Sequence, residues 1–128
     1  MTTFTFDHMH LRSPDPDATA AFFEKMFGAE VIRTMQRGKP RVDVRLDGVN
    51  IFIAPSADKD GQAPAHPHRG LDHFGLRVRG LDDVVAGLKA KGVKFTVEPH
   101  LARPGLRICF LETPEGVLIE IVDRDVAA

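Results

Sequence analysis

The chain has 128 residues, 43% of them hydrophobic and 27% charged, which is the balance of one ordinary globular domain. Its formal net charge of −1 gives no electrostatic case for nucleic acid or an anionic membrane as a partner. A single cysteine excludes an intrachain disulfide, no apolar run reaches a bilayer span, and the first residues show no secretory leader, so we expect a cytoplasmic protein.

The first half of the chain combines β-forming runs with one clear helix signal. A helix is predicted from Pro16 to about Phe27, with Asp15 as its N-cap. Asp47-Gly48 is the strongest hairpin signal in the sequence. Strands are predicted at about residues 4–12, 30–36, 41–46 and 49–54. The first module, about residues 4–55, therefore has the order β-α-β-β-β.

The second half repeats this order after a linker. Residues 56–70 lack periodicity and are rich in polar residues and proline, which is typical of a linker. In the second module, about residues 71–123, the helix is predicted at about 82–91. Its strands are predicted at 71–78, 93–98, 106–112 and 117–123. We expect one α+β domain over residues 1–128, built from two tandem βαβββ modules.

The two modules also begin on nearly the same sequence. Phe6-Asp7-His8-Met9-His10-Leu11-Arg12 is followed much later by Leu71-Asp72-His73-Phe74-Gly75-Leu76-Arg77. In each copy an apolar residue and an aspartate precede a histidine, and Leu-Arg follows after two intervening residues. An internal repeat indicates a duplicated structural unit. The two histidines are therefore expected at equivalent points of equivalent strands.

One carboxylate completes a possible metal site. Glu120 lies in the otherwise apolar run 117–122, where a buried carboxylate is costly unless it is paired or bound to a cation. Two neutral imidazoles and one carboxylate form an arrangement that holds a divalent metal and leaves positions open for a substrate with two adjacent oxygens. A lone histidine in a strand is more often structural, and a glutamate near a strand end is often solvated. Their coincidence with the repeat favours a metal site at His8, His73 and Glu120.

Three pieces of the sequence together resemble one known family: Asp7-His8-Met9-His10-Leu11, Asp72-His73-Phe74-Gly75-Leu76 and Thr113-Pro114-Glu115-Gly116-Val117-Leu118-Ile119-Glu120. The chain is similar over essentially its whole length to the vicinal oxygen chelate superfamily. That superfamily includes glyoxalase I, methylmalonyl-CoA epimerase, fosfomycin-resistance proteins and extradiol dioxygenases. The resemblance implies paired βαβββ units that form a curved, open sheet around a metal, with the same three side chains as ligands.

The sequence departs from several members of this family at one position. Aligning Gly48 with Gly116 places Phe52 opposite Glu120, where glyoxalase I enzymes have a carboxylate that acts as ligand and proton-transfer base. Phenylalanine cannot bind a metal, so three protein ligands are expected instead. This number is closer to the dioxygenase and fosfomycin-resistance branches. The fosfomycin branch also uses a basic, hydroxyl-rich anion pocket, which the sequence does not reveal.

Parity along the strands places further side chains in the predicted pocket. His10 shares a face with His8, where it is a candidate acid, base or substrate ligand, or else a residue of the rim. Asp43 is a second candidate base, although a solvated strand face explains a run such as Arg41-Asp43-Arg45 more often. Cys109, between Ile108 and Phe110, is expected in the core. The candidate substrate-binding residues are Asn50, Phe52, Gly75, Phe110 and His100.

The sequence thus predicts a metal-dependent enzyme of the lyase, isomerase or epimerase type. It would bind a small substrate through vicinal oxygens and stabilise an enolate-type intermediate, with Ni, Co, Mn, Zn or Fe(II) as its divalent metal. An extradiol-type Fe(II) ring-cleavage dioxygenase is the alternative, but such enzymes usually place a tyrosine beside the metal and this chain has none. A non-catalytic, resistance-type binding protein is the third possibility. We expect a homodimer, because an open sheet leaves edges and apolar surface to be covered.

Overall fold

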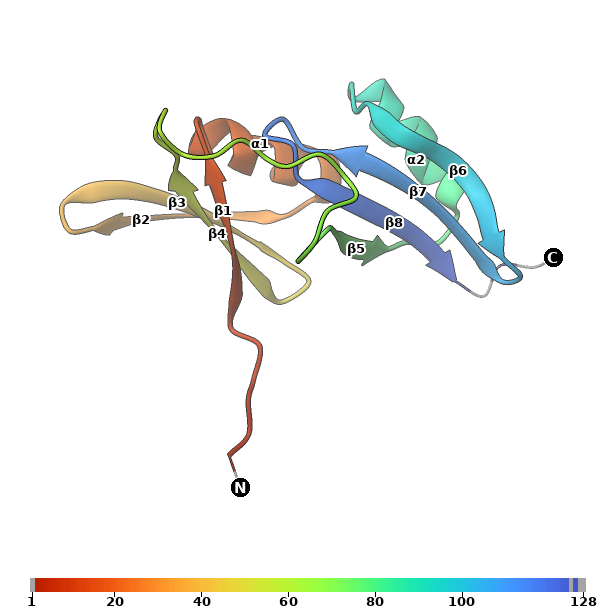
Figure 1. Ribbon diagram of the computed structural model, residues 1–128, viewed down its shortest axis with the longest axis horizontal. Coiled ribbons are helices and arrows are strands. Elements are labelled where there is room, and N and C mark those ends of the chain that lie inside the picture. Colours follow the sequence, from red (N-terminus) through yellow and green to blue (C-terminus); the bar gives the residue numbers. More distant parts are fainter. Residues whose placement is uncertain (1, 125, 127–128) are drawn as a thin grey trace. The chain divides into compact units, whose positions relative to one another are not determined.

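The computed structural model describes residues 2–124 and Val126, and the chain divides into two compact units, one ending at Gly61 and the other beginning at Gln62 (Figure 1). The first unit contains β1 (His8–Ser13), α1 (Pro16–Phe27), β2 (Glu30–Gln36), β3 (Lys39–Leu46) and β4 (Val49–Pro55). The second contains β5 (Phe74–Arg77), α2 (Leu81–Ala90), β6 (Phe95–Arg103), β7 (Leu106–Glu112) and β8 (Leu118–Arg124). Both units have the order βαβββ, which confirms the α+β fold predicted from the sequence.

Each unit is a four-stranded sheet of the same topology. The strand orders are β1-β4-β3-β2 and β5-β8-β7-β6, so the first strand of each unit lies beside its last. That outer pair is parallel, and the other neighbours in each sheet are antiparallel. The helix of each unit returns the chain, so the second strand runs in the direction of the first. Two antiparallel connections then bring the last strand parallel to the first as well.

In the first unit, α1 packs on one face of the sheet. Asp15 caps this helix by accepting a hydrogen bond from Ala18 N at 3.1 Å, Pro16 occupies its first turn, and Gly28 ends it at a φ of 70°. The predicted bounds of the helix are therefore confirmed. The core between helix and sheet is formed by buried side chains of α1, β3 and β4, namely Thr19, Ala20, Phe23, Val42, Val44, Ile51 and Ile53. The opposite face of the sheet carries the polar side chains of these strands.

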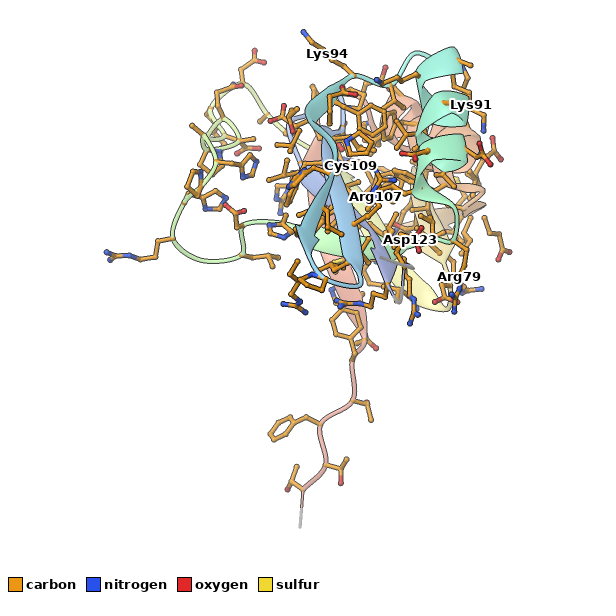
Figure 2. The ribbon with its side chains drawn as sticks, turned by 90° about the vertical axis from the view of Figure 1, so that its right-hand side faces the viewer. Arg79, Lys91, Lys94, Arg107, Cys109 and Asp123 are labelled. Carbon is orange, nitrogen blue, oxygen red and sulfur yellow. The ribbon has the colours of Figure 1, made fainter. Side chains whose placement is uncertain are left out.

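The second unit uses the same plan. The buried side of α2 consists of Leu81, Val85 and Leu88, which join the core residues Cys109, Leu111, Ile119 and Ile121 of β7 and β8 (Figure 2). Arg107 of β7 forms an ion pair of 2.8 Å with Asp82 in the first turn of α2. No helix among the described residues has the length and apolar character needed to cross a bilayer.

Three strands differ most from their predicted bounds. The first strand begins at His8 rather than residue 4, and Phe4 and Phe6 are exposed at 92% and 71%. The ladder explains this, because His8 pairs with Asn50, the second residue of β4, so residues 4–6 would extend past the beginning of that strand. The strand predicted at 71–78 likewise shortens to Phe74–Arg77. The strand predicted at 93–98 instead runs to Arg103, and its irregular register between Val97 and His100 accommodates Pro99.

Cys109 is expected to resist alkylation in the folded protein. Its side chain is fully buried, and burial raises the pKa of the thiol to about 11. At pH 8 only about one thiol in a thousand would then be a reactive thiolate, even where reagent had access. Mass spectrometry after iodoacetamide treatment should show one adduct in urea and none in buffer. Equal labelling under the two conditions would contradict the burial of this residue.

Candidate metal centre and pocket

The second unit brings His73 and Glu120 together. His73 directly precedes β5, and Glu120 lies within β8, opposite Gly75 in the parallel ladder. His73 Nε2 is 3.2 Å from Glu120 Oε1, and His73 Nδ1 donates a hydrogen bond of 2.8 Å to Asp72 Oδ2. The half-buried imidazole is therefore held on both sides by a carboxylate.

The contacts between Asp72 and His73 stabilise the charged form of each side chain. Hydrogen bonds from the His73 ring and from the backbone N–H of His68 lower the pKa of Asp72 to about 2. The hydrogen bond to Asp72 raises the pKa of His73 above its ordinary value, although burial acts in the opposite direction. Asp72 is thus a carboxylate at any physiological pH. A cation that binds His73 through Nε2 has to displace any proton on that nitrogen.

This donor set fits a divalent cation. With metal–ligand bonds of about 2.1 Å, two ligand atoms lie about 3.0 Å apart at a 90° angle and about 3.4 Å apart at a tetrahedral angle. The observed 3.2 Å between Nε2 and Oε1 falls between these values. Asp72 on Nδ1 supplies the outer carboxylate that commonly orients a metal-binding imidazole. The same spacing also suits a hydrogen-bonded ion pair, so the geometry fits a metal without requiring one.

The first unit repeats the aspartate–histidine pair. His8 Nδ1 donates to Asp7 Oδ2 at 2.6 Å, which leaves Nε2 for another partner. The His8 ring stacks on Phe52, with 4.2 Å between the ring centroids and 24° between the planes. His10 lies with its ring edge-on to His8 at 6.3 Å. The predicted residues His8, His10 and Phe52 are therefore neighbours on the polar face of this sheet.

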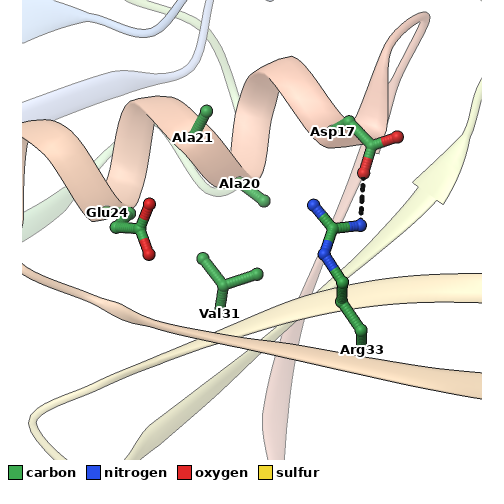
Figure 3. A pocket seen from close by; sticks show the side chains of 6 residues that line it. All are labelled: Asp17, Ala20, Ala21, Glu24, Val31 and Arg33. Carbon is green, nitrogen blue, oxygen red and sulfur yellow. Dashed lines mark hydrogen bonds and ion pairs between the residues drawn. The ribbon is translucent and has the colours of Figure 1, made fainter.

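A pocket of about 800 Å³, a size that suits a small metabolite, includes these side chains and extends to the start of α1. The pocket is lined by His8, His10, Pro16, Asp17, Arg33, Gln36, Arg37, Lys39, Pro40, Arg41, Val42, Phe52, Ile53, Ala54 and Pro55. A smaller hollow of about 410 Å³ lies between α1 and β2 (Figure 3). Asp17 and Arg33, joined by an ion pair of 2.7 Å, line both hollows.

Two other candidates of the first unit are engaged in hydrogen bonds. Asp43 is 7% exposed, and its Oδ1 accepts from Ile53 N at 3.0 Å while its Oδ2 accepts from Arg41 Nε at 2.7 Å. Both carboxylate oxygens thus hold parts of the same sheet. The bond from Arg41 also fixes the position of the Arg41 side chain. The second candidate, Asn50, accepts a hydrogen bond of 3.0 Å from Arg45 Nε through its side-chain oxygen.

The candidates of the second unit lie at different places on the sheet. Phe110 is opposite Glu120 in the ladder between β7 and β8, and its ring lies edge-on to His73 at 5.1 Å. Gly75 is beside Glu120, and a methyl group added there would meet only ordinary contacts, the nearest being 3.8 Å. His100 is exposed on β6, where its Nδ1 donates to a backbone carbonyl of the same strand.

A further cluster was not predicted from the sequence. His66, His68 and Asp72 offer ligand atoms that all lie within 4.8 Å of one another. Asp72 Oδ1 accepts from His68 N at 3.1 Å and lies 3.4 Å from His66 Nδ1, while its Oδ2 holds His73. Asp72 therefore connects the end of the linker to His73. The only signal in the sequence was a His-x-His pair followed four residues later by an aspartate.

Curated relatives of this chain carry the name lactoylglutathione lyase. It is 25% identical over 124 residues to a putative lactoylglutathione lyase of Brassica oleracea var. gemmifera, and 24% identical to lactoylglutathione lyase GLX1 of Arabidopsis thaliana. Each alignment covers 93% of this chain and 44% of the relative. The chain thus spans less than half the length of these relatives.

Solved structures share the fold. A glyoxalase family protein from Enterococcus faecalis has a TM-score of 0.75 at 23% identity, over 92% of this chain and 96% of the other. The fosfomycin resistance protein FosX from Listeria monocytogenes has a TM-score of 0.73 at 18% identity, over 95% and 94% of the two chains. The family model of the Glyoxalase/Bleomycin resistance protein/Dioxygenase superfamily matches residues 5–121. The chain belongs to this superfamily.

Proposed function

We propose that this protein is a metal-dependent enzyme of the lyase, isomerase or epimerase type, acting on a small substrate that presents two adjacent oxygens. The observation that carries the proposal is the His73 ring, held between Asp72 and Glu120 with Nε2 3.2 Å from a carboxylate oxygen. Relatives named lactoylglutathione lyase support the reaction class, and membership of the superfamily supports a divalent metal.

The proposed ligands are His8, His73 and Glu120. His8 is included because Asp7 holds its Nδ1 as Asp72 holds that of His73, which presents Nε2 in the form a metal requires. Three protein ligands leave coordination positions for a substrate. A divalent ion bound there, whether Ni²⁺, Co²⁺, Mn²⁺, Zn²⁺ or Fe²⁺, polarises a carbonyl and stabilises negative charge on its oxygen.

His10 is the proposed base. It lines the same pocket as His8, and imidazole is the side chain best suited to give and take protons near neutral pH. Asp43 is assigned a positioning role, because both of its oxygens are already engaged. The residues proposed to contact substrate are Asn50, Phe52, Gly75, Phe110 and His100.

We also propose that the chain forms a homodimer. The edge strands β2 and β6 carry exposed Met35, Val97 and Leu101, and an open sheet edge is a surface on which a strand of another chain can pair.

Proton exchange next to a carbonyl is the expected activity. The protein loaded with Co²⁺, Mn²⁺, Ni²⁺ or Zn²⁺ should exchange the α-protons of some small hydroxyketones, hydroxyaldehydes or keto acids for deuterium, followed in D₂O by ¹H NMR. His10→Ala should slow this exchange by about 100-fold or more, because a general base contributes about that much. The metal content of this variant should equal that of the wild type.

Three results would reject the proposal. One is the absence of exchange with every metal across the substrate panel. Another is exchange that continues unchanged after the metal is removed by a chelator. Oxygen uptake on catechols by the Fe²⁺-loaded protein, without α-proton exchange, would assign the ring-cleaving chemistry instead.

A further inference from the structure

The pocket beside His8 contains more positive than negative charge. Four cationic side chains line it, Arg33, Arg37, Lys39 and Arg41, whereas Asp17 is the one carboxylate in its lining. The chain as a whole has a formal net charge of −1, so this excess is a local feature. A concave surface with one sign of charge concentrates ligands of the opposite sign.

Two of these four charges are compensated by neighbours. Arg33 Nη1 pairs with Asp17 Oδ1 at 2.7 Å, across the edge of the smaller hollow (Figure 3). Arg41 pairs with Asp43, which lies two residues along the same strand and is buried. Arg37, in the turn between β2 and β3, and Lys39, the first residue of β3, have no ion-pair partner within residues 2–124. The excess charge therefore comes from these two residues.

Arg41 is fixed in one orientation despite its compensated charge. Its Nε donates to Asp43 at 2.7 Å, its Nη1 donates to Gln36 Oε1 at 2.8 Å, and its guanidinium carbon is 4.5 Å from the centre of the Phe52 ring. These contacts leave the N–H groups of Nη2 for a ligand. Phe52 also stacks on His8, so one ring contacts both the guanidinium and a proposed metal ligand. A pre-oriented guanidinium loses little side-chain freedom when it binds an oxyanion.

We propose that this pocket binds the anionic group of the substrate, a carboxylate or a phosphate, through Arg41, Arg37 and Lys39. The proposal rests on the proposed function and specifies its substrate class: a small oxygenated metabolite that carries a fixed negative charge. Arg41 sets the position of the anion by directed hydrogen bonds, and the other two side chains add charge. The oxygen atoms that react would then lie on the His8 side of the pocket.

The experiment is an anion titration of the full chain after its metal has been removed by a chelator. Inorganic phosphate and acetate are added separately at constant ionic strength, and the ring signals of His8 and His10 are followed by NMR. At least one of the two anions should produce saturable shifts, and their relative affinity distinguishes a phosphate from a carboxylate site. Removing the metal first ensures that the anion binds to side chains.

Variants of matched charge test the assignment. Arg37→Gln combined with Lys39→Gln should raise the dissociation constant about tenfold, and Arg41→Gln should do the same. Lys94→Gln combined with Arg103→Gln removes the same charge from exposed positions of the second unit and should leave the constant unchanged. Arg41→Lys keeps the charge but loses the planar fork, so it should fall between wild type and Arg41→Gln.

The outcomes separate this proposal from the proposed function. Absence of saturable binding by either anion, or equal binding by the wild type and the Arg37/Lys39 variant, would overturn the anion site. Equal weakening by the Lys94/Arg103 control would overturn it too, because only net charge would then matter. Failure of α-proton exchange in the metal-loaded protein would reject the proposed reaction while leaving a measured anion site intact.

Discussion

Replacing His73 with alanine is expected to weaken the binding of a divalent metal by about 100-fold or more while the protein stays folded. Loss of an outer carboxylate that merely orients a ligand costs about 10- to 100-fold in metal affinity, so loss of the ligand itself should cost at least the upper value. His73 is half-buried and lies before β5, outside the core, so stability should change little. Equilibrium dialysis against Co²⁺ or Zn²⁺ measures the affinity, and circular dichroism checks the fold.

Companion variants identify the ligand set. Glu120→Gln and His8→Ala should also weaken binding, whereas His100→Ala should not, since His100 is an exposed histidine of the same unit as His73. The double variant His66→Ala and His68→Ala tests the cluster around Asp72. If that variant lost the metal and His73→Ala retained it, the ion would belong to the linker cluster and the proposed ligand set would be wrong.

The internal repeat made the fold predictable from the sequence. Because the two modules share the Asp-His…Leu-Arg pattern, the order of elements in one could be checked against the other. The register supports this comparison: His10 is opposite Phe52 in the first sheet, and Gly75 is opposite Glu120 in the second. Aligning the two modules by sequence matches His10 with Gly75 and Phe52 with Glu120, which are the same positions. Local signals also mark the bounds of α1: Asp15 caps its start, Pro16 is its first residue and Gly28 caps its end.

Contacts that depend on loops and long side chains were not predictable. Arg37 and Lys39 lie between the strands predicted at 30–36 and 41–46, and their place in the pocket depends on the conformation of that connection, with Arg37 at a φ of 52°. The positively charged pocket was therefore missed. The linker cluster was missed for a similar reason, because no periodicity fixes where His66 lies. Phe4 and Phe6 show the opposite error, since a strong β propensity produced no strand where no partner strand was present.

Asp123→Ala is expected to destabilise the protein by about 2–4 kcal/mol, because a buried carboxylate that accepts two hydrogen bonds leaves two donors without a partner when it is removed. Asp123, labelled in Figure 2, belongs to β8. Its side chain is buried, with 7% of the residue exposed. Its Oδ2 accepts from Gly80 N at 3.0 Å and from Leu81 N at 3.1 Å, at the start of α2. Gly80, the N-cap residue of α2, has no side chain that could cap the helix, so Asp123 of β8 caps it instead. Urea unfolding followed by circular dichroism measures the loss.

A matched control exists at the other helix. Asp15 also caps a helix with its side chain, but it is exposed and accepts one such bond, so Asp15→Ala should cost only about 1 kcal/mol. Asp123→Asn keeps an acceptor oxygen but loses the charge that favours a helix N-terminus, and should fall between the two. If Asp123→Ala cost no more than Asp15→Ala, the bond from β8 to α2 would contribute no more than an ordinary surface cap. The strand that carries Glu120 would then be held by its ladders and its core contacts alone.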